Sequence, residues 1–285
     1  MASQDWQDSG REGLSTRPAG VDFSSSVIGV FDSGLGGLSV LAAIAEALPR
    51  ANLTYLADTA HVPYGNKPEG FITGRVLAIG RHLADSGCNL LVVACNTATT
   101  TAIQALRDHL PQIPVVGVEP GVKPAAQHSR NKHIAVLATE ATARSRRLKQ
   151  LVEQHASTCK VDIVPCPGWA THVETLQPNS PQFRAEVAAK IQPLVDNGVD
   201  RLVLGCTHYA FLAPLIAPLI LGRAELVDVS AAVARQVERL STAQGAQSLL
   251  ELHATQHPER LRAALPALGL HLLAERAKGA RLVSV

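Results

Sequence analysis

Residues 90–100 read LLVVACNTATT, and residues 201–211 read RLVLGCTHYAF. Each stretch begins as an apolar run of strand length, stops at a cysteine, and continues with short polar side chains. Apolar runs bounded in this way are typical of strands buried on both faces of a parallel sheet. Two such strand ends, at Cys95 and Cys206, therefore favour an α/β fold that uses one local arrangement twice.

The chain on either side of these stretches alternates between strand-like and helix-like patterns. We expect strands near residues 25–32, 53–58, 88–95, 113–120, 132–139, 161–167, 201–206 and 224–230. We expect helices near residues 38–49, 69–87, 97–111, 140–156, 182–198 and 212–220, and a final, mostly helical tail from residue 231. This alternation predicts α/β architecture in two similar lobes, each a mostly parallel sheet flanked by helices, with an active site in the cleft between them.

Composition excludes several classes of protein. The chain has 285 residues, of which 46% are hydrophobic and 18% charged, so it can bury a substantial core. Its net charge of +2, without a Lys/Arg-rich block, favours neither nucleic-acid binding nor a membrane surface. Residues 1–22 form a polar N-terminal extension that does not resemble a secretory signal. The five cysteines are odd in number and form no CxxC pair, which predicts a reducing cytoplasm and no metal site.

The two strand-terminal cysteines predict acid–base chemistry. Cys95 stands at the start of the helix near 97–111, where backbone N–H groups should lower the pKa of its thiol below about 8.5. His208, two residues after Cys206, can relay a proton or stabilise a thiolate. Asp32 ends a strand before the glycine-rich turn 33–37, where it can assist protonation or hold a substrate ammonium group. Two similar thiols on opposite sides of a ligand suit removal of a proton from one face of a carbon and its return on the other, which is racemisation.

Taken together, the motifs resemble those of the glutamate racemase family over about residues 27–240. The segments that carry the resemblance are GVFDSGLGGLSVL (29–41), YLADTAHVPYGNKP (55–68), VVACNTATTTAI (92–103), PVVGVEPGVKPAA (114–126), IAVLATEATARS (134–145) and LVLGCTHYAFL (202–212). The resemblance implies a cofactor-independent, two-base isomerase that interconverts L- and D-glutamate for peptidoglycan and thereby for cell-wall biogenesis and cell shape. It also implies that Cys95 exchanges the Cα proton with D-glutamate and that Cys206 exchanges it with L-glutamate.

The resemblance further assigns auxiliary and binding residues. Asp32 and His208 become the acid–base partners of the two cysteines, and Glu174 closes the stretch CPGWATHVE, whose interior departs from the family pattern at residues 169–172. Ala210 stands where the family usually has proline. Substrate contacts are implied for Asp32, Ser33, Pro63, Tyr64, Gly65, Asn96, Thr97, Thr207 and His208.

Domain organisation and partners follow from the same resemblance. A first lobe would comprise residues 23–118 and 229–285, completed by the C-terminal helices, and a second lobe residues 119–228. The resemblance is compatible with a homodimer and with activation by a nucleotide-linked wall precursor. Three alternatives stay open from the residues alone: a racemase for another amino acid such as aspartate, a catalytically silent regulatory homologue, and a thiol-redox protein.

Overall fold

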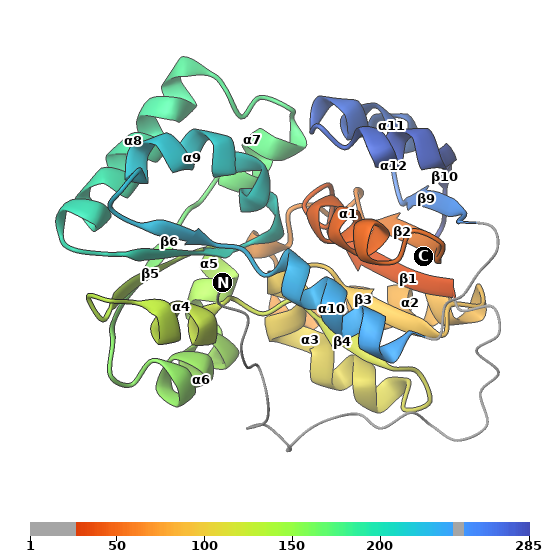
Figure 1. The fold of residues 1–285 in the computed structure, drawn as a ribbon. Coiled ribbons are helices and arrows are strands. Elements are labelled where there is room, and N and C mark those ends of the chain that lie inside the picture. The colour runs from red at the N-terminus through yellow and green to blue at the C-terminus, as the bar shows by residue number, and fades with distance from the viewer. Residues whose placement is uncertain (1–26, 242–247) are drawn as a thin grey trace, which may run out of the picture.

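The computed structural model describes residues 27–241 and 248–285 (Figure 1). The polar extension predicted at residues 1–22 lies outside the described residues. All strand pairs of the described chain run parallel, and they form one six-stranded and one four-stranded sheet. The predicted fold class, two lobes of parallel sheet flanked by helices, is confirmed.

The six-stranded sheet has the order β10-β9-β2-β1-β3-β4. Its strands are β1 (Val27–Asp32), β2 (Asn52–Ala57), β3 (Leu90–Val93), β4 (Val115–Gly117), β9 (Leu250–Ala254) and β10 (Ala277–Leu282). Its helices are α1 (Leu38–Ala47), α2 (Glu69–Asp85), α3 (Asn96–His109), α10 (Ser230–Leu240), α11 (Pro258–Ala267) and α12 (His271–Arg276), with a short 3₁₀ helix at Tyr64–Asn66.

Helices cover both faces of this sheet. Ile28 and Val30 of β1 pack in one apolar cluster with α1, α10 and α11, whereas Phe31 packs in a second cluster with α2 and α3. Side chains of opposite faces thus alternate along the strand, as its period of two requires. Full burial of each large aliphatic side chain contributes roughly 1.5–3 kcal/mol, so both layers of helices stabilise the sheet.

The four-stranded sheet has the order β6-β5-β7-β8. Its strands are β5 (His133–Ala138), β6 (Lys160–Pro165), β7 (Arg201–Gly205) and β8 (Glu225–Val227). The helices of this lobe are α4 (Val122–His128), α5 (Glu140–Arg144), α6 (Arg146–His155), α7 (Trp169–Glu174), α8 (Pro181–Asp196) and α9 (Ala213–Ile220), preceded by a 3₁₀ helix at Thr207–Leu212. Clusters on its two faces again take alternate residues of β5.

One prediction of secondary structure was wrong and another was incomplete. The single helix expected near 140–156 is broken at Ser145, whose backbone is extended and whose hydroxyl accepts the N–H of Leu148 at 3.1 Å, so that it caps α6. The tail from residue 231 is helical over α10, α11 and α12, but it also contains two strands that were not expected, because β9 and β10 extend the first sheet beyond β2. Neither strand has a continuous apolar run like that of β3: polar residues interrupt β9, and β10 is the edge strand, where one side of the ladder stays open.

The positions of the two sheets in the chain bear on the lobe boundaries. Strands β1–β4 and β9–β10 belong to the first sheet, and β5–β8 belong to the second. The chain therefore passes between sheets after β4 and again after β8. The boundaries at 118/119 and 228/229 stay a prediction, which limited proteolysis could examine.

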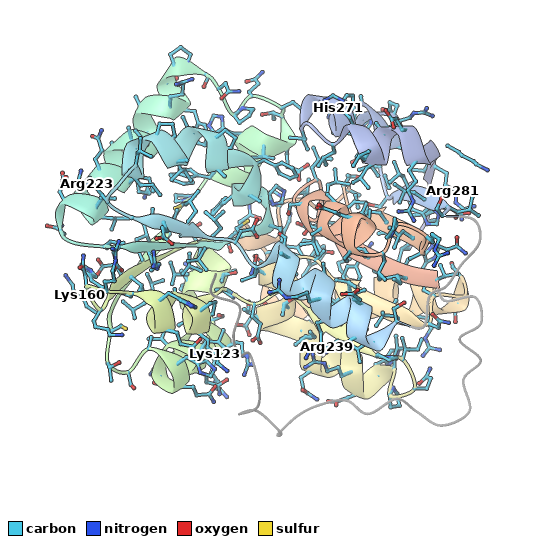
Figure 2. All side chains as sticks on the ribbon, viewed as in Figure 1. Lys123, Lys160, Arg223, Arg239, His271 and Arg281 are labelled. Atoms are coloured by element: carbon cyan, nitrogen blue, oxygen red, sulfur yellow. The ribbon has the colours of Figure 1, made fainter. Side chains whose placement is uncertain are left out.

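Basic side chains are distributed over the surface of both lobes. The labelled side chains Lys123, Lys160, Arg223, Arg239 and Arg281 lie on different elements around both lobes (Figure 2). Within residues 27–241 and 248–285, no helix combines the length and apolar character that crossing a bilayer requires.

Candidate active site

The carboxyl ends of strands from both sheets carry the predicted cysteines. Cys95 lies two residues beyond β3 and is the N-cap of α3, and Cys206 directly follows β7. Each cysteine residue is only 5% exposed. Neither forms a disulfide, nor does any of the three other cysteines, all of which lie within the described residues. Two buried free thiols at strand ends are thus presented by opposite lobes.

Asp32 lies beside Cys95. It ends β1, the neighbour of β3, and is fully buried. Its Oδ2 accepts the N–H of Gly37 at 2.8 Å, which fixes the carboxyl group over the turn before α1. The Cys95 thiol is within hydrogen-bonding reach of the carboxylate, and its Sγ lies 4.0 Å from Ser33 Oγ. Asp32 and Ser33 are therefore brought together with Cys95, as the sequence predicts.

Cys206 begins a chain of polar contacts that crosses to the other lobe. Its Sγ lies 3.6 Å from His208 Nδ1, and His208 Nε2 lies 2.5 Å from Glu174 Oε1. The same carboxylate oxygen accepts the N–H of Leu35, in the turn after β1, at 2.7 Å. Ser39 of α1 also lies 3.4 Å from the carbonyl oxygen of Thr207. Glu174, placed by resemblance alone, therefore lies at the end of α7 in direct contact with His208.

Burial and these contacts shift the pKa values of His208 and Asp32. Burial lowers the pKa of His208, but the hydrogen bonds and charges of Cys206 and Glu174 outweigh it and raise the pKa well above the usual value. Burial raises the pKa of Asp32, although His208, the Gly37 N–H and Cys95 oppose the shift. The site therefore favours an imidazolium beside Cys206, whereas burial disfavours the carboxylate form of Asp32 beside Cys95.

The pKa direction predicted for Cys95 was wrong. Ala98 N–H of α3 does point at Sγ, at 3.5 Å, and lowers the pKa of the thiol. However, complete desolvation and the negative charge of Asp32 raise the pKa well above the ordinary value. The start of α3 therefore affects the pKa of Cys95 less than burial does, because removal of water from around the sulfur disfavours the charged thiolate.

Two hydroxyl groups beside the predicted Thr97 were missed by the sequence analysis. Thr97 Oγ1, near the start of α3, lies 3.0 Å from Thr139 Oγ1 and 3.4 Å from Thr142 Oγ1. Thr139 directly follows β5 and caps α5, so the contact joins the two lobes. The sequence feature that could have indicated Thr139 is its position directly after an apolar strand, which is also the feature that indicated Cys95 and Cys206.

The remaining predicted contact residues lie around these groups. Pro63, which follows a cis peptide bond, leads into Tyr64, and the Tyr64 ring packs in the same apolar cluster as Cys95. A side chain at Gly65 would meet Thr139 at 2.9 Å, so the loop approaches the second lobe closely. Asn96 is 2% exposed; its Nδ2 donates to the carbonyl of Val118, while its Oδ1 is buried without a partner.

Glycines permit the lobes to approach each other. A Cβ atom at Gly34 would come closer than 3.0 Å to Glu174, and one at Gly36 would come closer than 3.0 Å to His208 and Thr207. Only residues without a side chain fit here, which explains the glycine-rich turn after β1. The glycines of this turn therefore allow the close contact between the lobes.

Not every polar residue near a strand end joins the site. Glu119 pairs with Arg147 at 2.6 Å, and Asp228 accepts the N–H and hydroxyl of Ser230 at 2.8 Å. Both lie near the crossings between the sheets. In the described part of the chain, no group of three or more His, Cys, Asp or Glu side chains is placed to hold a metal ion.

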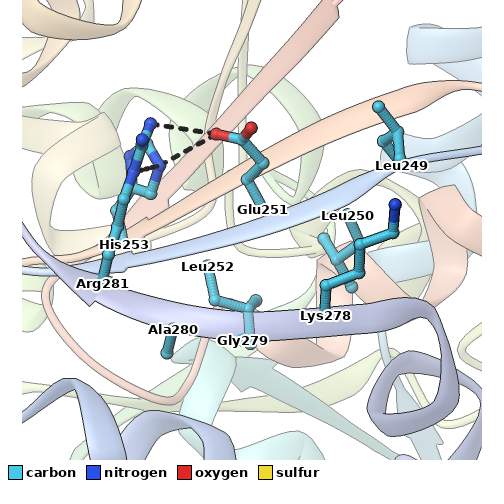
Figure 3. A pocket seen from close by; sticks show the side chains of 9 residues that line it. All are labelled: Leu249, Leu250, Glu251, Leu252, His253, Lys278, Gly279, Ala280 and Arg281. Atoms are coloured by element: carbon cyan, nitrogen blue, oxygen red, sulfur yellow. Dashed lines mark hydrogen bonds and ion pairs between the residues drawn. The ribbon is translucent and has the colours of Figure 1, made fainter.

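Two cavities help to locate the site. A cavity of about 760 Å³ adjoins Leu35, Pro63 and Glu174 and extends to the amino end of α11. A separate pocket of about 410 Å³ lies over β9 and β10, where Glu251, His253 and Arg281 bond to one another (Figure 3). The second pocket contains none of the predicted site residues. The first therefore adjoins the cysteine site, and the second lies away from it.

Comparison with known proteins agrees with this geometry. Residues 28–237 match the family model described as Asp/Glu/Hydantoin racemase. A glutamate racemase of Pseudomonas aeruginosa is 44% identical over 86% of this chain and 94% of its own length. Among solved structures, a glutamate racemase isoform of Bacillus anthracis has a TM-score of 0.81 and 27% identity, covering 91% of this chain and 98% of its own. The Escherichia coli glutamate racemase in complex with L-glutamate and the activator UDP-MurNAc-ala has a TM-score of 0.74 and 28% identity, covering 91% and 99%.

Proposed function

The chain belongs to the Asp/Glu/Hydantoin racemase family and is an amino-acid racemase, and from that premise we propose that it interconverts L- and D-glutamate with Cys95 and Cys206 as its two bases. The observation that carries the proposal is the placement of two buried free thiols at strand ends of opposite sheets, each beside its own acid–base partner. The relatives named as glutamate racemases support glutamate as the substrate.

In the proposed reaction, one cysteine thiolate removes the Cα proton and the other cysteine thiol returns a proton to the opposite face of the carbanion. The proton states of the two cysteines are exchanged after each turnover, so the enzyme is then ready for the other enantiomer. Cys206 takes the proton of L-glutamate, and Cys95 takes that of D-glutamate. Because a thiolate is a weak base for this proton, exclusion of water and fixed dipoles must stabilise the carbanion.

The partners of the two thiols differ in kind, and we propose matching roles. His208, held as an imidazolium by Glu174, stabilises a thiolate at Cys206. Asp32, whose pKa is raised by burial, lies beside Cys95 and assists proton transfer at that thiol. Burial raises the pKa of the Cys95 thiol well above its usual value, so Cys95 is protonated in the free enzyme and can return a proton to the carbanion formed from L-glutamate.

Substrate binding would use the polar groups around the thiols. The buried Oδ1 of Asn96 is a free acceptor for the substrate ammonium group. Ser33, Thr97, Thr207, the loop Pro63–Tyr64–Gly65 and the additional hydroxyls of Thr139 and Thr142 supply hydrogen bonds to the carboxylates. Because the thiols are buried, the substrate can enter only if the contacts that Glu174 and Thr97 make between the lobes open.

The deciding experiment is incubation of the purified protein with L-glutamate in D₂O, without added cofactor. We expect loss of optical rotation together with one deuterium at Cα. A parallel incubation with L-aspartate tests the alternative substrate. Faster turnover of aspartate than of glutamate would identify the protein as an aspartate racemase of the same family. Absence of exchange with both amino acids would contradict racemase activity under these conditions, and the assay is then repeated with a muramyl nucleotide.

The cellular role and regulation are part of the same proposal. D-Glutamate produced here would supply peptidoglycan, and rescue of a bacterium that requires D-glutamate is the corresponding test. A nucleotide-linked wall precursor is a candidate activator, because the similar Escherichia coli structure contains the activator UDP-MurNAc-ala. Deletion of residues 1–20 with unchanged kinetics, with and without the precursor, would exclude a role of that segment. The homodimer stays a prediction, to be tested by light scattering.

A further inference from the structure

One buried carboxylate close to the site has no role in the proposed chemistry. Asp58 directly follows β2 and is fully buried. Its Oδ2 accepts from Arg75 Nε at 2.9 Å and from Tyr64 OH at 2.6 Å. Its Oδ1 accepts from Arg75 Nη2 at 2.9 Å and Thr255 Oγ1 at 2.8 Å, and lies 3.0 Å from His61 Nδ1. Both oxygens are therefore fully occupied by donors from four residues.

These donors come from segments that are far apart in the chain. Arg75 belongs to α2, Tyr64 to the loop predicted to bind substrate, and Thr255 to the end of β9. We call Asp58 and its four side-chain donors the Asp58 junction. Two main-chain hydrogen bonds reinforce it: Asp58 N–H donates to the carbonyl of Asp32 at 2.9 Å, and Thr255 N–H donates to the carbonyl of Ala57 at 3.1 Å. Asp58 thus joins the end of the strand that carries Asp32 to the substrate loop and to the C-terminal strands.

The charges at this junction are compatible with a fixed arrangement. Burial raises the pKa of Asp58, but hydrogen bonds from Arg75, Tyr64 and His61 lower it below the usual value. Burial and the Asp58 charge raise the pKa of Tyr64, so its phenol stays protonated and donates. The two-pronged pairing with Arg75 is directional as well as neutralising, since the guanidinium fork matches both carboxylate oxygens.

Tyr64 is the link from this junction to the reacting groups. Its ring is 1% exposed and packs in one cluster with Cys95 and Ala98. The next residue, Gly65, approaches Thr139 of the other lobe so closely that a Cβ atom would stand 2.9 Å away. A small rotation of Tyr64 would therefore move the loop relative to both Cys95 and the opposite lobe.

We propose that Asp58 is a positioning residue for racemisation, which holds the loop Pro63–Tyr64–Gly65 in the substrate-binding geometry through Tyr64 and locks it to β9 through Thr255. The proposal rests on the proposed function of the site. Asp58 itself does not touch the thiols; it acts through Tyr64 and through the carbonyl of Asp32.

The test compares Asp58→Asn with Asp200→Asn. Asp200 is also buried, at 2%, and its carboxylate accepts from Ser129 Oγ at 2.6 Å and from two main-chain N–H groups before β5. Both variants should lose thermal stability. We expect Asp58→Asn to raise KM for both enantiomers by about 10- to 100-fold, since small misplacements of binding groups have effects of this size. Asp200→Asn should change KM by less than about twofold, because it lies away from the site.

A further variant and a second readout separate the possible failures. Thr255→Val, outside the binding machinery, should raise KM to a smaller extent. Hydrogen exchange of peptides spanning residues 59–68 should be faster in Asp58→Asn than in Asp200→Asn, and this readout does not depend on activity. Equal KM changes and equal exchange in the two variants would overturn the positioning role. Faster exchange in a protein whose wild type turns over neither glutamate nor aspartate would instead overturn the proposed function.

Discussion

His208 Nε2 lies 2.5 Å from Glu174 Oε1, and the same oxygen accepts the main-chain N–H of Leu35 from the other lobe. One carboxylate therefore has two effects: it maintains the charge of the imidazole beside Cys206, and it connects the two lobes. Charge state and lobe closure are coupled, because neither contact of Glu174 can change without affecting the other.

Replacement of either strand-end cysteine should abolish turnover. Cys95→Ser and Cys206→Ser each remove one of two required proton carriers, and we expect racemisation to fall by at least ~100-fold in each. The assay is loss of optical rotation with Cα deuteration. Cys159→Ser, at a free cysteine outside the site, is the matched control and should keep normal rates. Near-normal turnover in either strand-end variant is incompatible with two bases.

Removal of the Glu174 charge should alter the pH profile. Glu174→Gln lowers the pKa of His208, so the imidazolium form is lost at a lower pH and the alkaline limb of kcat/KM moves to lower pH. Glu186→Gln is the control, because Glu186 lies on α8 of the same lobe and accepts a hydrogen bond from Trp169 Nε1, at 3.0 Å, rather than from His208. An unmoved alkaline limb in Glu174→Gln would show that His208 does not depend on Glu174.

The same pair predicts how folding stability varies with pH. The pKa of His208 is raised in the folded state, so its contribution is fully present below the unfolded value of about 6.5 and is lost as pH rises through the folded value. Urea unfolding from pH 6 upward should therefore show a steeper loss in the wild type than in His208→Gln. Parallel curves would contradict this linkage.

Asp32→Asn should lower the activity of the enzyme and raise its stability. A carboxyl group whose folded pKa is raised destabilises the folded state once pH exceeds its unfolded pKa, and this effect is complete above the folded pKa. Asparagine can still accept the N–H of Gly37 but carries no charge. We expect a higher melting temperature at pH 7, by a few degrees, and a lower kcat with either enantiomer. The melting temperature is measured by calorimetry and kcat by steady-state kinetics. A lower melting temperature in Asp32→Asn would contradict a raised pKa of Asp32 in the folded state.

A methyl group in the turn after β1 should separate the lobes. Gly36→Ala places Cβ against the imidazole ring of His208 and the hydroxyl of Thr207, closer than 3.0 Å. We expect kcat/KM to fall by about 100-fold, as for a misplaced catalytic group. Gly74→Ala on α2 meets nothing within 4 Å and should stabilise the helix by about 0.5–1 kcal/mol with unchanged kinetics. Equal kinetics in the two variants would show that lobe contact at Gly36 is unimportant.

Much of the site could be read from residues that terminate apolar strands. Asp32, Cys95 and Cys206 share this feature, and parallel sheets place such residues at one edge. Thr139 has the same placement after β5 but was not selected, because a single threonine has weaker chemical meaning than a cysteine. Asp58 was missed for another reason: its importance depends on Arg75 and Thr255, which are distant in the chain.

The amino-acid sequence by itself determined the alternation of strands and helices, the two strand-end thiols and the family. These features are local, since periodicity and short motifs are properties of neighbouring residues. Only the tertiary structure decided the pKa direction of Cys95, the contact of Glu174 with His208, and the pairing of β9 and β10 as two further strands beside β2. Each of these depends on burial or on pairing between segments far apart in the chain, and such long-range terms are not encoded in any one stretch of sequence.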